Sequence, residues 1–530
     1  MPQPILPLEL ILKVLLCLET EDLLRCRLTS FAFDSLIRET KELQYDVELW
    51  TNGYEDASSR DGDASTRLQT ISHIQQRWNN IHDSCFSLTI PTNFTHLWQF
   101  QNCTVHEGIL LVTPSNSVRS IICRRTTPTD RFLLRFDLDE VVRTKQLTPR
   151  TLDVDRPFIR AHAFPHEELL VLERVISHIP DGALVNFIHP DFYSLELEFR
   201  SLNDGRPHPR AKQPRLRIPS RQHISLELNV SGEFLIVYDL TYFAESTMRT
   251  GWGTHLYHWP TGQLIKTWAC VRDETFVFGG TLLSKDAILV PTINLVTPSP
   301  TMSLDLYSIQ CDPDSQWRCT LTGRFMLPTL YSIDMITSRI HQAHIWIHDK
   351  GGMSSTSSKC QPSPRLFEIH FPDYIMIIRH SAFFGHYPEG SSETLLDGGV
   401  GTVPWDVWGP HNSRILEIYS PSTQSVISGY RVSFHNEIFD FCPRRLSDPV
   451  GTDVGGVDIQ EPSLLTPCIF SGEVTTSLPY RRTSLPSHLQ STRQSRCYLV
   501  ETTDGPKCIR VHRVENHPYE SVQIVGISVT

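Results

Sequence analysis

The period of the hydrophobic positions changes along the chain and divides it into three parts. Over residues 6–37 apolar side chains recur at helical spacing, interrupted by short polar turns. A second helical stripe covers residues 66–81. After residue 86 short apolar strands alternate with clusters of Pro, Gly, Ser and Asp. This order predicts a small helical unit, a connecting helix and a large β-rich region.

The first predicted helix is apolar on most of its surface. Pro7 suits its first turn, and Glu9 there suits the positive end of the helix dipole. One stripe consists of Leu8, Ile11, Leu12, Leu15 and Leu16, and another face of Leu10, Val14, Cys17 and Leu18. Such a helix must be buried on more than one side, and a three-helix unit is too small to do this alone. The surplus apolar surface predicts a protein partner.

Two more short helices follow. The second begins after Thr20, has acidic residues in its first turn, and carries Leu23, Leu24, Cys26 and Leu28. Ser30 is a suitable N-cap for a third helix, whose apolar positions are Phe33, Leu36 and Ile37.

Over this segment the sequence resembles the F-box motif. The resemblance lies in Leu6–Ile11, Val14–Leu16 with Leu18, and Glu21–Cys26, followed by Leu28, Ser30, Phe33 and Leu36. It implies binding to a Skp-type adaptor, which connects to a cullin-RING scaffold. The adaptor-binding residues that it implies are Leu6, Pro7, Leu8, Glu9, Leu10, Ile11, Val14, Leu15, Leu18, Leu23 and Leu24. A plain helical subdomain that packs on its own chain remains the alternative.

The connecting helix, expected over residues 66–81, carries Leu68, Ile71, Ile74, Trp78 and Ile81 mostly on one side. We expect it to fix the N-terminal unit to the next domain. Residues 52–63, rich in Gly, Ser and Asp, are expected to form a loop.

The β-rich region contains a weak recurring unit. Residues 233–238 and 254–259 are strand-like and are followed by a Thr-Gly turn, and residues 286–290 and 304–309 repeat the order. With the segment Trp259–Gly262, this resembles a blade of a WD-like β-propeller, although no Gly-His start or Trp-Asp pair recurs at a fixed period. We therefore expect a degenerate propeller, with a β-sandwich pair or an irregular β domain as the alternative.

A further resemblance connects the C-terminal region with F-box proteins of mushroom-forming fungi. The matching segments are Val403–Pro410, Arg414, Gly429–Val432 and Thr476–Tyr480. We interpret Trp405 and Trp408 as structural residues at a blade edge in preference to ligand-binding residues.

Composition excludes several classes of function. The formal charge of −11 argues against a general nucleic-acid or membrane-surface binder. Thirteen cysteines without a C-x-x-C pair fit reduced thiols, which predicts a cytoplasmic or nuclear location. No signal peptide or transmembrane run is visible. We expect no metal, no cofactor and no catalytic residues, because the sequence has no G-x-S-x-G, P-loop or H-E-x-x-H motif. A hydrolase site assembled from distant residues stays open.

Three stretches look like loops. The basic stretch 200–223 is expected to be a solvated linker, with binding of an acidic partner or phosphate as the alternative. The Ser-rich stretches 351–364 and 481–496 are expected to be mobile loops.

Together these patterns predict an α+β multidomain protein. Residues 1–45 form an F-box with three helices, residues 46–85 a helical connector, and residues 86–530 a large all-β domain, expected to be a degenerate β-propeller. The predicted function is that of a non-catalytic substrate receptor in an SCF-type cullin-RING ubiquitin ligase, whose β domain binds an unknown protein substrate. The alternative is an interaction scaffold outside any ligase.

Overall fold

The fold is described from a computed structural model of the chain. It describes residues 6–18, 20–52, 54–56, 63–79, 85–89, 103–106, 109–112, 132–137, 140, 144, 150–155, 158, 160–177, 193–218, 225–240, 253–269, 275–277, 279–284, 286–294, 300–314, 316–329, 347–348, 360–362, 366–371, 374–383, 401–417, 426–428, 430–434, 436–442, 456–465, 470–484, 495–502, 505–513 and 520–527.

Five helices form the N-terminal part of the described chain. They are α1 (Leu8–Leu15), α2 (Thr20–Thr29), α3 (Phe31–Glu39), α4 (Lys41–Asn52) and α5 (Ala64–Asn79). Pro7 precedes α1 with an extended backbone, and its carbonyl accepts hydrogen bonds from the Leu10 and Ile11 amides. The Ser30 hydroxyl accepts from the Phe33 amide at 3.2 Å and so caps α3 as predicted.

The first four helices share one small core. Leu15, Leu23, Ile37, Leu43 and Val47 are buried together, one or two from each helix. Half-buried side chains on α1, α2 and α3 pack around them. On each of the four helices the apolar residues at helical spacing therefore face the shared core, as expected for amphipathic helices.

Seven sheets of four or more strands make up most of the described β region, and their strands pair in the antiparallel sense except for β24 in sheet 5. Sheet 1 contains β2 (Cys85–Thr89), β33 (Ser495–Thr502), β34 (Gly505–Arg513) and β35 (Glu520–Ile527). Sheet 2 contains β3 (Cys103–His106), β4 (Ile109–Val112), β5 (Phe132–Asp137) and β6 (Arg150–Asp153). Sheet 3 contains β7 (Arg160–Phe164), β8 (Leu169–Ser177), β9 (Tyr193–Ser201) and β10 (Arg215–Ile218). Sheet 4 contains β11 (Ser225–Ser231), β12 (Phe234–Leu240), β13 (Gly253–His258) and β14 (Gln263–Ala269).

The remaining sheets carry extra strands. Sheet 5 contains β15 (Thr275–Val277), β16 (Thr281–Ser284), β17 (Ala287–Asn294), β18 (Thr301–Cys311), β19 (Trp317–Met326) and β24 (Gly401–Val403). Sheet 6 contains β20 (Ile347–His348), β22 (Leu366–His370), β23 (Tyr374–Arg379) and β25 (Ser413–Glu417). Sheet 7 contains β26 (Val426–Ser428), β27 (Arg431–Phe434), β28 (Glu437–Asp440), β29 (Gly456–Ile459) and β32 (Tyr480–Ser484).

Shorter elements lie between and beside these sheets. Two pairs of strands stand apart, β1 (Tyr54–Asp56) with β21 (Cys360–Pro362) and β30 (Ser463–Leu465) with β31 (Val474–Thr476). The 3-10 helices are η2 (Pro165–Glu167) and η4 (His380–Phe383), and one further helix is α10 (Trp405–Asn412).

The strand order closes the sheets into a ring. Sheets 2 to 7 follow each other along the chain, and the last three strands, β33 to β35, belong to sheet 1. Strand β2, which precedes sheet 2 in the sequence, completes sheet 1 by pairing with β35 from Cys85↔Ile527 to Thr89↔Gln523. Buried apolar clusters fill the spaces between sheets 2 and 3, 3 and 4, 4 and 5, 5 and 6, and 6 and 7. Contacts between β26 and β33 join sheets 7 and 1. Radial four-stranded sheets closed by strands from both ends are the architecture of a β-propeller.

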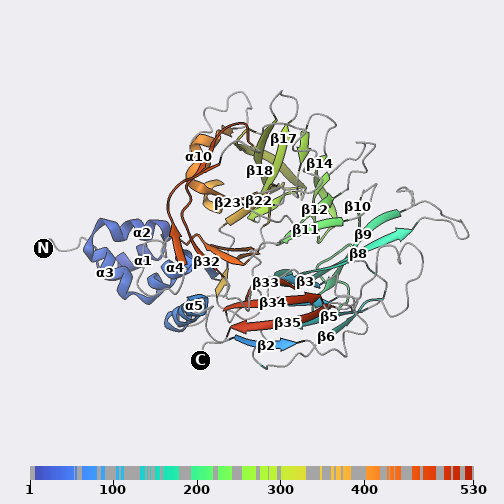
Figure 1. Cartoon of the computed structure of the whole chain (residues 1–530), viewed down its shortest axis with the longest axis horizontal. Coiled ribbons are helices and arrows are strands. Elements are labelled where there is room, and N and C mark those ends of the chain that lie inside the picture. The colour runs from blue at the N-terminus through green and yellow to red at the C-terminus, as the bar shows by residue number, and fades with distance from the viewer. Residues whose placement is uncertain are drawn as a thin grey trace, which may run out of the picture.

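The helical unit lies beside this ring (Figure 1) and is tied to it at several points. The Cys442 thiol lies 2.9 Å from the Thr51 carbonyl oxygen, and the buried Arg431 donates to Gln75 of α5 at 2.9 Å while pairing with Asp440. Strand β1, directly after α4, pairs with β21. These contacts fix the orientation of α4 and α5 on the β region.

The predicted fold class, helices followed by a large β-rich region, is confirmed. The division at residues 45 and 85 stays our proposal for the domain boundaries, although α4 runs across residue 45.

All four loop predictions were wrong for part of their stretch, and two of the stretches pair with each other, because β1 lies within residues 52–63 and β21 within residues 351–364. Residues 200–218 include the end of β9, a tight hairpin and all of β10, and Arg200 is buried. Tyr480–Ser484 forms β32 and Ser495 begins β33. Charge and Ser content suggested loops there, but alternate residues such as Leu216 and Ile218 pack inside, which is the pattern of a short outer strand.

Candidate functional site

Exposed apolar side chains concentrate on the first three helices. Among the described residues, six of the ten large hydrophobic side chains that are exposed lie between residues 6 and 31. We call this set the apolar face, and its members are Leu6, Leu8, Leu10, Val14, Leu28 and Phe31. A surface of this kind on a small helical unit indicates a site for a protein partner.

The two apolar stripes of helix α1 differ in burial: one packs on the helical core and the other is exposed. Leu15 is buried in the helical core, while Ile11 and Leu12 are half-buried against it. Leu10 and Val14, which are one helical turn apart, are 45% and 55% exposed. The helix therefore has one face for the core and another that nothing in the described chain covers.

The predicted adaptor-binding residues fall into three groups. Leu6, Pro7, Leu8, Glu9, Leu10 and Val14 are exposed. Ile11, Leu18 and Leu24 are half-buried, and Leu15 and Leu23 are only 2% and 1% exposed. In this conformation Leu15 and Leu23 support the helices from inside, so a partner would reach the first group.

Leu28 and Phe31 were missed as surface anchors. They are the most exposed large hydrophobic side chains in the described chain, at 89% and 85%. They flank the Ser30 cap, where α2 ends and α3 begins. The sequence held one signal, because Phe31 does not share the spacing of Phe33, Leu36 and Ile37 that forms the buried stripe of α3.

An ion cluster joins α2 to α3. Arg27 of α2 and Arg38 of α3 each approach a carboxylate oxygen of Asp34 at 2.9 Å. The hydrogen bonds from Arg27 and then Arg38 hold the pKa of Asp34 below its ordinary value. This cluster holds α2 and α3 together close to the turn that carries Leu28 and Phe31.

Residues 4–43 match the family model of the F-box domain. This segment, which contains α1, α2 and α3, is an F-box domain. The apolar face thus lies wholly on the F-box, and α4 and α5 connect it to the ring.

No curated protein matches the chain. Several solved structures match distantly. The WD40 domain of SCAP from fission yeast has a TM-score of 0.28 and 10% identity, over 84% of this chain and 98% of that one. Apo AztD from Citrobacter koseri has 0.29 and 9%, over 81% and 90%, and Kuenenia stuttgartiensis hydrazine synthase has 0.27 and 11%, over 59% and 79%. The ring itself is evident from the strand pairing and from the buried clusters between successive sheets.

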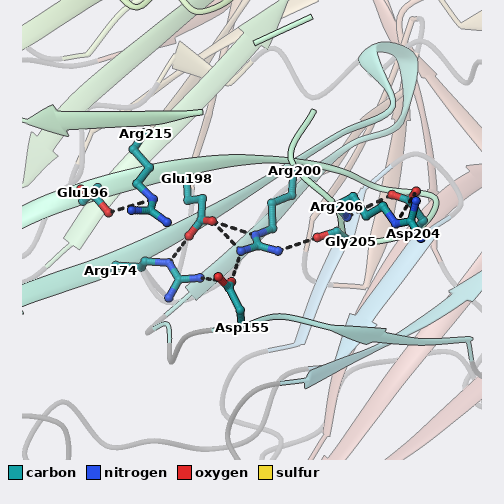
Figure 2. A network of polar contacts seen from close by, with 9 residues as sticks. All are labelled: Asp155, Arg174, Glu196, Glu198, Arg200, Asp204, Gly205, Arg206 and Arg215. Atoms are coloured by element: carbon teal, nitrogen blue, oxygen red, sulfur yellow. Dashed lines mark hydrogen bonds and ion pairs between the residues drawn. The ribbon is translucent and has the colours of Figure 1, made fainter. Parts of the chain in front are cut away.

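A network of charged side chains lies on β8 and β9 and reaches the segment after β6 (Figure 2). Glu198 of β9 pairs with Arg174 of β8, and its carboxylate accepts from Arg200 at 2.6 Å. Arg200 also donates to the Gly205 carbonyl at 2.7 Å and reaches Asp155, just beyond β6. Guanidinium groups engage both the Glu198 and the Asp155 carboxylates, so the network joins β8 and β9 to the segment that follows β6.

The segment that contains Trp405 and Trp408 forms helix α10 and packs between sheets 5 and 6. Trp408 is fully buried, and its indole N–H donates to the Met326 carbonyl at 3.0 Å. Trp405 meets it edge-on, with ring centroids 5.2 Å apart. These contacts agree with the structural role predicted for both residues, although the sequence did not predict a helix.

Within the described ranges, no group of three or more His, Cys, Asp and Glu side chains is placed to hold a metal ion. Over the same residues, the search for a helix long and apolar enough to cross a membrane found none.

Proposed function

We propose that the chain is the substrate receptor of an SCF-type cullin-RING ubiquitin ligase. The F-box binds a Skp-type adaptor, the adaptor connects to the cullin-RING scaffold, and the β domain binds a protein substrate. The observation that carries the proposal is the apolar face on the matched F-box.

No residue of such a receptor breaks or forms a bond. Its contribution is to raise the effective concentration of a substrate lysine near the charged ubiquitin carrier. A fixed orientation between the two binding parts serves this role. The contacts of Cys442 with Thr51 and of Arg431 with Gln75 support such an orientation, because both join the connector to sheet 7.

The decisive experiment is co-purification of the full chain with a Skp-type adaptor. We expect Leu6→Ala, Pro7→Ala and Leu10→Ala together to weaken binding by roughly 10⁴-fold, because three apolar anchors contribute about 2 kcal/mol each. All three positions are exposed, so the core of the helical unit stays intact.

A matched control uses exposed apolar residues outside the F-box. Leu264→Ala, Val457→Ala and Leu464→Ala remove similar side chains from β14, β29 and β30. We expect this variant to bind the adaptor as the unchanged protein does. Tight binding by the F-box variant, or equal loss in both variants, would contradict the proposal.

A non-catalytic scaffold outside the ligase is the competing function. The two are separated by asking whether a cullin co-purifies along with the adaptor. Adaptor without cullin would favour the scaffold, whereas a complex with both supports the ligase subunit.

Three narrower proposals accompany this one. We propose that the protein acts in the cytoplasm or nucleus, in line with its thirteen cysteines and the absence of a C-x-x-C pair from the sequence. We also propose that it belongs with F-box proteins of mushroom-forming fungi, on segments 403–410 and 476–480. A third proposal is that its substrate is recognised by the β domain, at residues 86–530.

A further inference from the structure

The outer strands of this ring accept additional strands. In sheet 5, β24 pairs in parallel with the outer strand β19, from Gly323↔Gly401 to Phe325↔Val403. In sheet 7, β29 pairs in the antiparallel sense with β32. Two of the seven sheets therefore already extend outward by strand addition, so the outer edges of this molecule are suited to backbone pairing.

Strand β10 is an outer strand that no strand of the described residues covers. It pairs with β9 along one edge, from Arg215↔Glu198 to Ile218↔Leu195, and no other strand of the described chain pairs with its second edge. Leu216 and Ile218 are buried and Arg215 and Arg217 are exposed, so the strand is firmly held in register. An uncovered edge of this kind presents backbone donors and acceptors to a partner.

The exposed side chains of β10 are both cationic. Arg215 lies 3.9 Å from Glu196, beyond hydrogen-bond distance, and Arg217 lies opposite the same Glu196 in the register of β9 and β10, so two arginines share one neighbouring carboxylate. The neighbouring carboxylate of Glu198 is turned inward to Arg174 and Arg200 (Figure 2). These charges are not a by-product of a basic composition, because the chain carries a formal charge of −11.

We propose that β10 binds an extended acidic segment of a protein partner as an added strand. Arg215 and Arg217 lie on one face, about 7 Å apart by strand geometry. Carboxylates at alternate positions of an added strand repeat at the same distance and would lie opposite them as cross-strand pairs. The inference that this partner is the substrate rests on the proposed function.

Charge selects this occupant over others. A second copy of the chain would place Arg against Arg, which is unfavourable for directly opposed residues. A single phosphate is bound best by guanidinium groups that converge on one point. On β10 the two cations are distributed along the strand, which suits two separate carboxylates.

The test is fluorescence anisotropy with three labelled peptides added to the full chain in complex with the adaptor. One peptide alternates Glu with Val and Thr, one has the same composition with its Glu residues in a block, and one has Lys in place of Glu. We expect the alternating Glu peptide to bind at least about tenfold tighter than the other two, and more weakly as salt is raised.

Variants then test the strand itself. We expect Arg215→Gln with Arg217→Gln to lose roughly tenfold or more in affinity for the alternating Glu peptide. Arg215→Glu with Arg217→Glu should transfer the preference to the Lys peptide. The matched control is Arg482→Glu, which reverses an exposed charge on β32, where β28 and β29 already pair with both edges, and it should bind as the unchanged protein does.

Adaptor binding is measured on the same samples. Equal binding of the alternating and block peptides, or unchanged binding in the β10 variants, overturns the inference while adaptor binding leaves the ligase proposal standing. Loss of adaptor binding by the unchanged chain overturns the ligase proposal whatever the peptides do.

Discussion

At the scale of single residues, the buried charges between sheets 2 and 3 stand out. Glu198 is 3% exposed and shares its carboxylate between Arg174 and Arg200, which are 4% and 5% exposed. Taking charges out of water is costly, and the attraction in the interior offsets this only when every partner is present. The intact network therefore adds little to the free energy of unfolding, whereas removal of one partner lowers that free energy strongly.

Glu198→Ala should destabilise the β region by about 3–5 kcal/mol, because it leaves two buried guanidinium groups without their shared carboxylate. The measurement is denaturant unfolding followed by tryptophan fluorescence. Arg206→Ala is the control, since Arg206 is 84% exposed on the adjoining hairpin and should change stability by less than about 0.5 kcal/mol. Similar effects of the two substitutions would mean that the network carries little stability.

At the scale of elements, the F-box depends on short helices whose ends are fixed locally. Helix α3 has nine residues and begins at the Ser30 cap, which also forms the turn that exposes Leu28 and Phe31. Helices of this length are marginal alone, so caps and tertiary packing decide whether they form. The cap therefore contributes both to stability and to the shape of the proposed adaptor-binding surface.

Ser30→Ala should destabilise the start of α3 by about 1 kcal/mol, because the Phe33 amide loses its acceptor. Hydrogen exchange of the α3 amides in the full chain should become faster by about fivefold, with no change in sheets 3 and 4. Ser30→Asp keeps an acceptor at the cap and should exchange as the unchanged protein does. Faster exchange in the Asp variant as well would argue against a capping role.

At the scale of the whole molecule, the ring is closed by a strand from each end of the β region. β2 lies before sheet 2 in the chain, yet it pairs with β35 in the last sheet. Closure of this kind couples the two ends of the β region and covers the edge of β35 with β2. In the sequence β2 follows α5, the helix that connects the F-box to the ring. The segment that attaches the F-box therefore continues into the strand that closes the ring.

A chain that begins at residue 90 should unfold several degrees below one that begins at residue 80, since only the longer one retains β2. Both lack the F-box and α5, so the comparison isolates the closing strand. The check is a thermal melt of the two fragments followed by circular dichroism. Equal midpoints would show that the pairing of β2 with β35 contributes little to the stability of the ring.

The sequence by itself determined the parts whose pattern is local. Leu15, Leu23 and Ile37 could be assigned to helices from their spacing, and Ser30 to a cap from its residue type, because the forces involved act within a few residues. The alternating strands after residue 86 likewise predicted a β-rich region. The order of motifs was sufficient to identify the F-box segment as well.

Only the tertiary structure decided which apolar residues are exposed and how the sheets are joined. Leu10 and Leu15 have similar chemistry, and neighbouring helices alone decide that one is exposed and the other buried. Arg200 and Arg217 belong to the same basic stretch, but one pairs within a buried network and the other lies on an open edge. The pairing of β2 with β35 joins segments more than 400 residues apart, and no local propensity records such a contact.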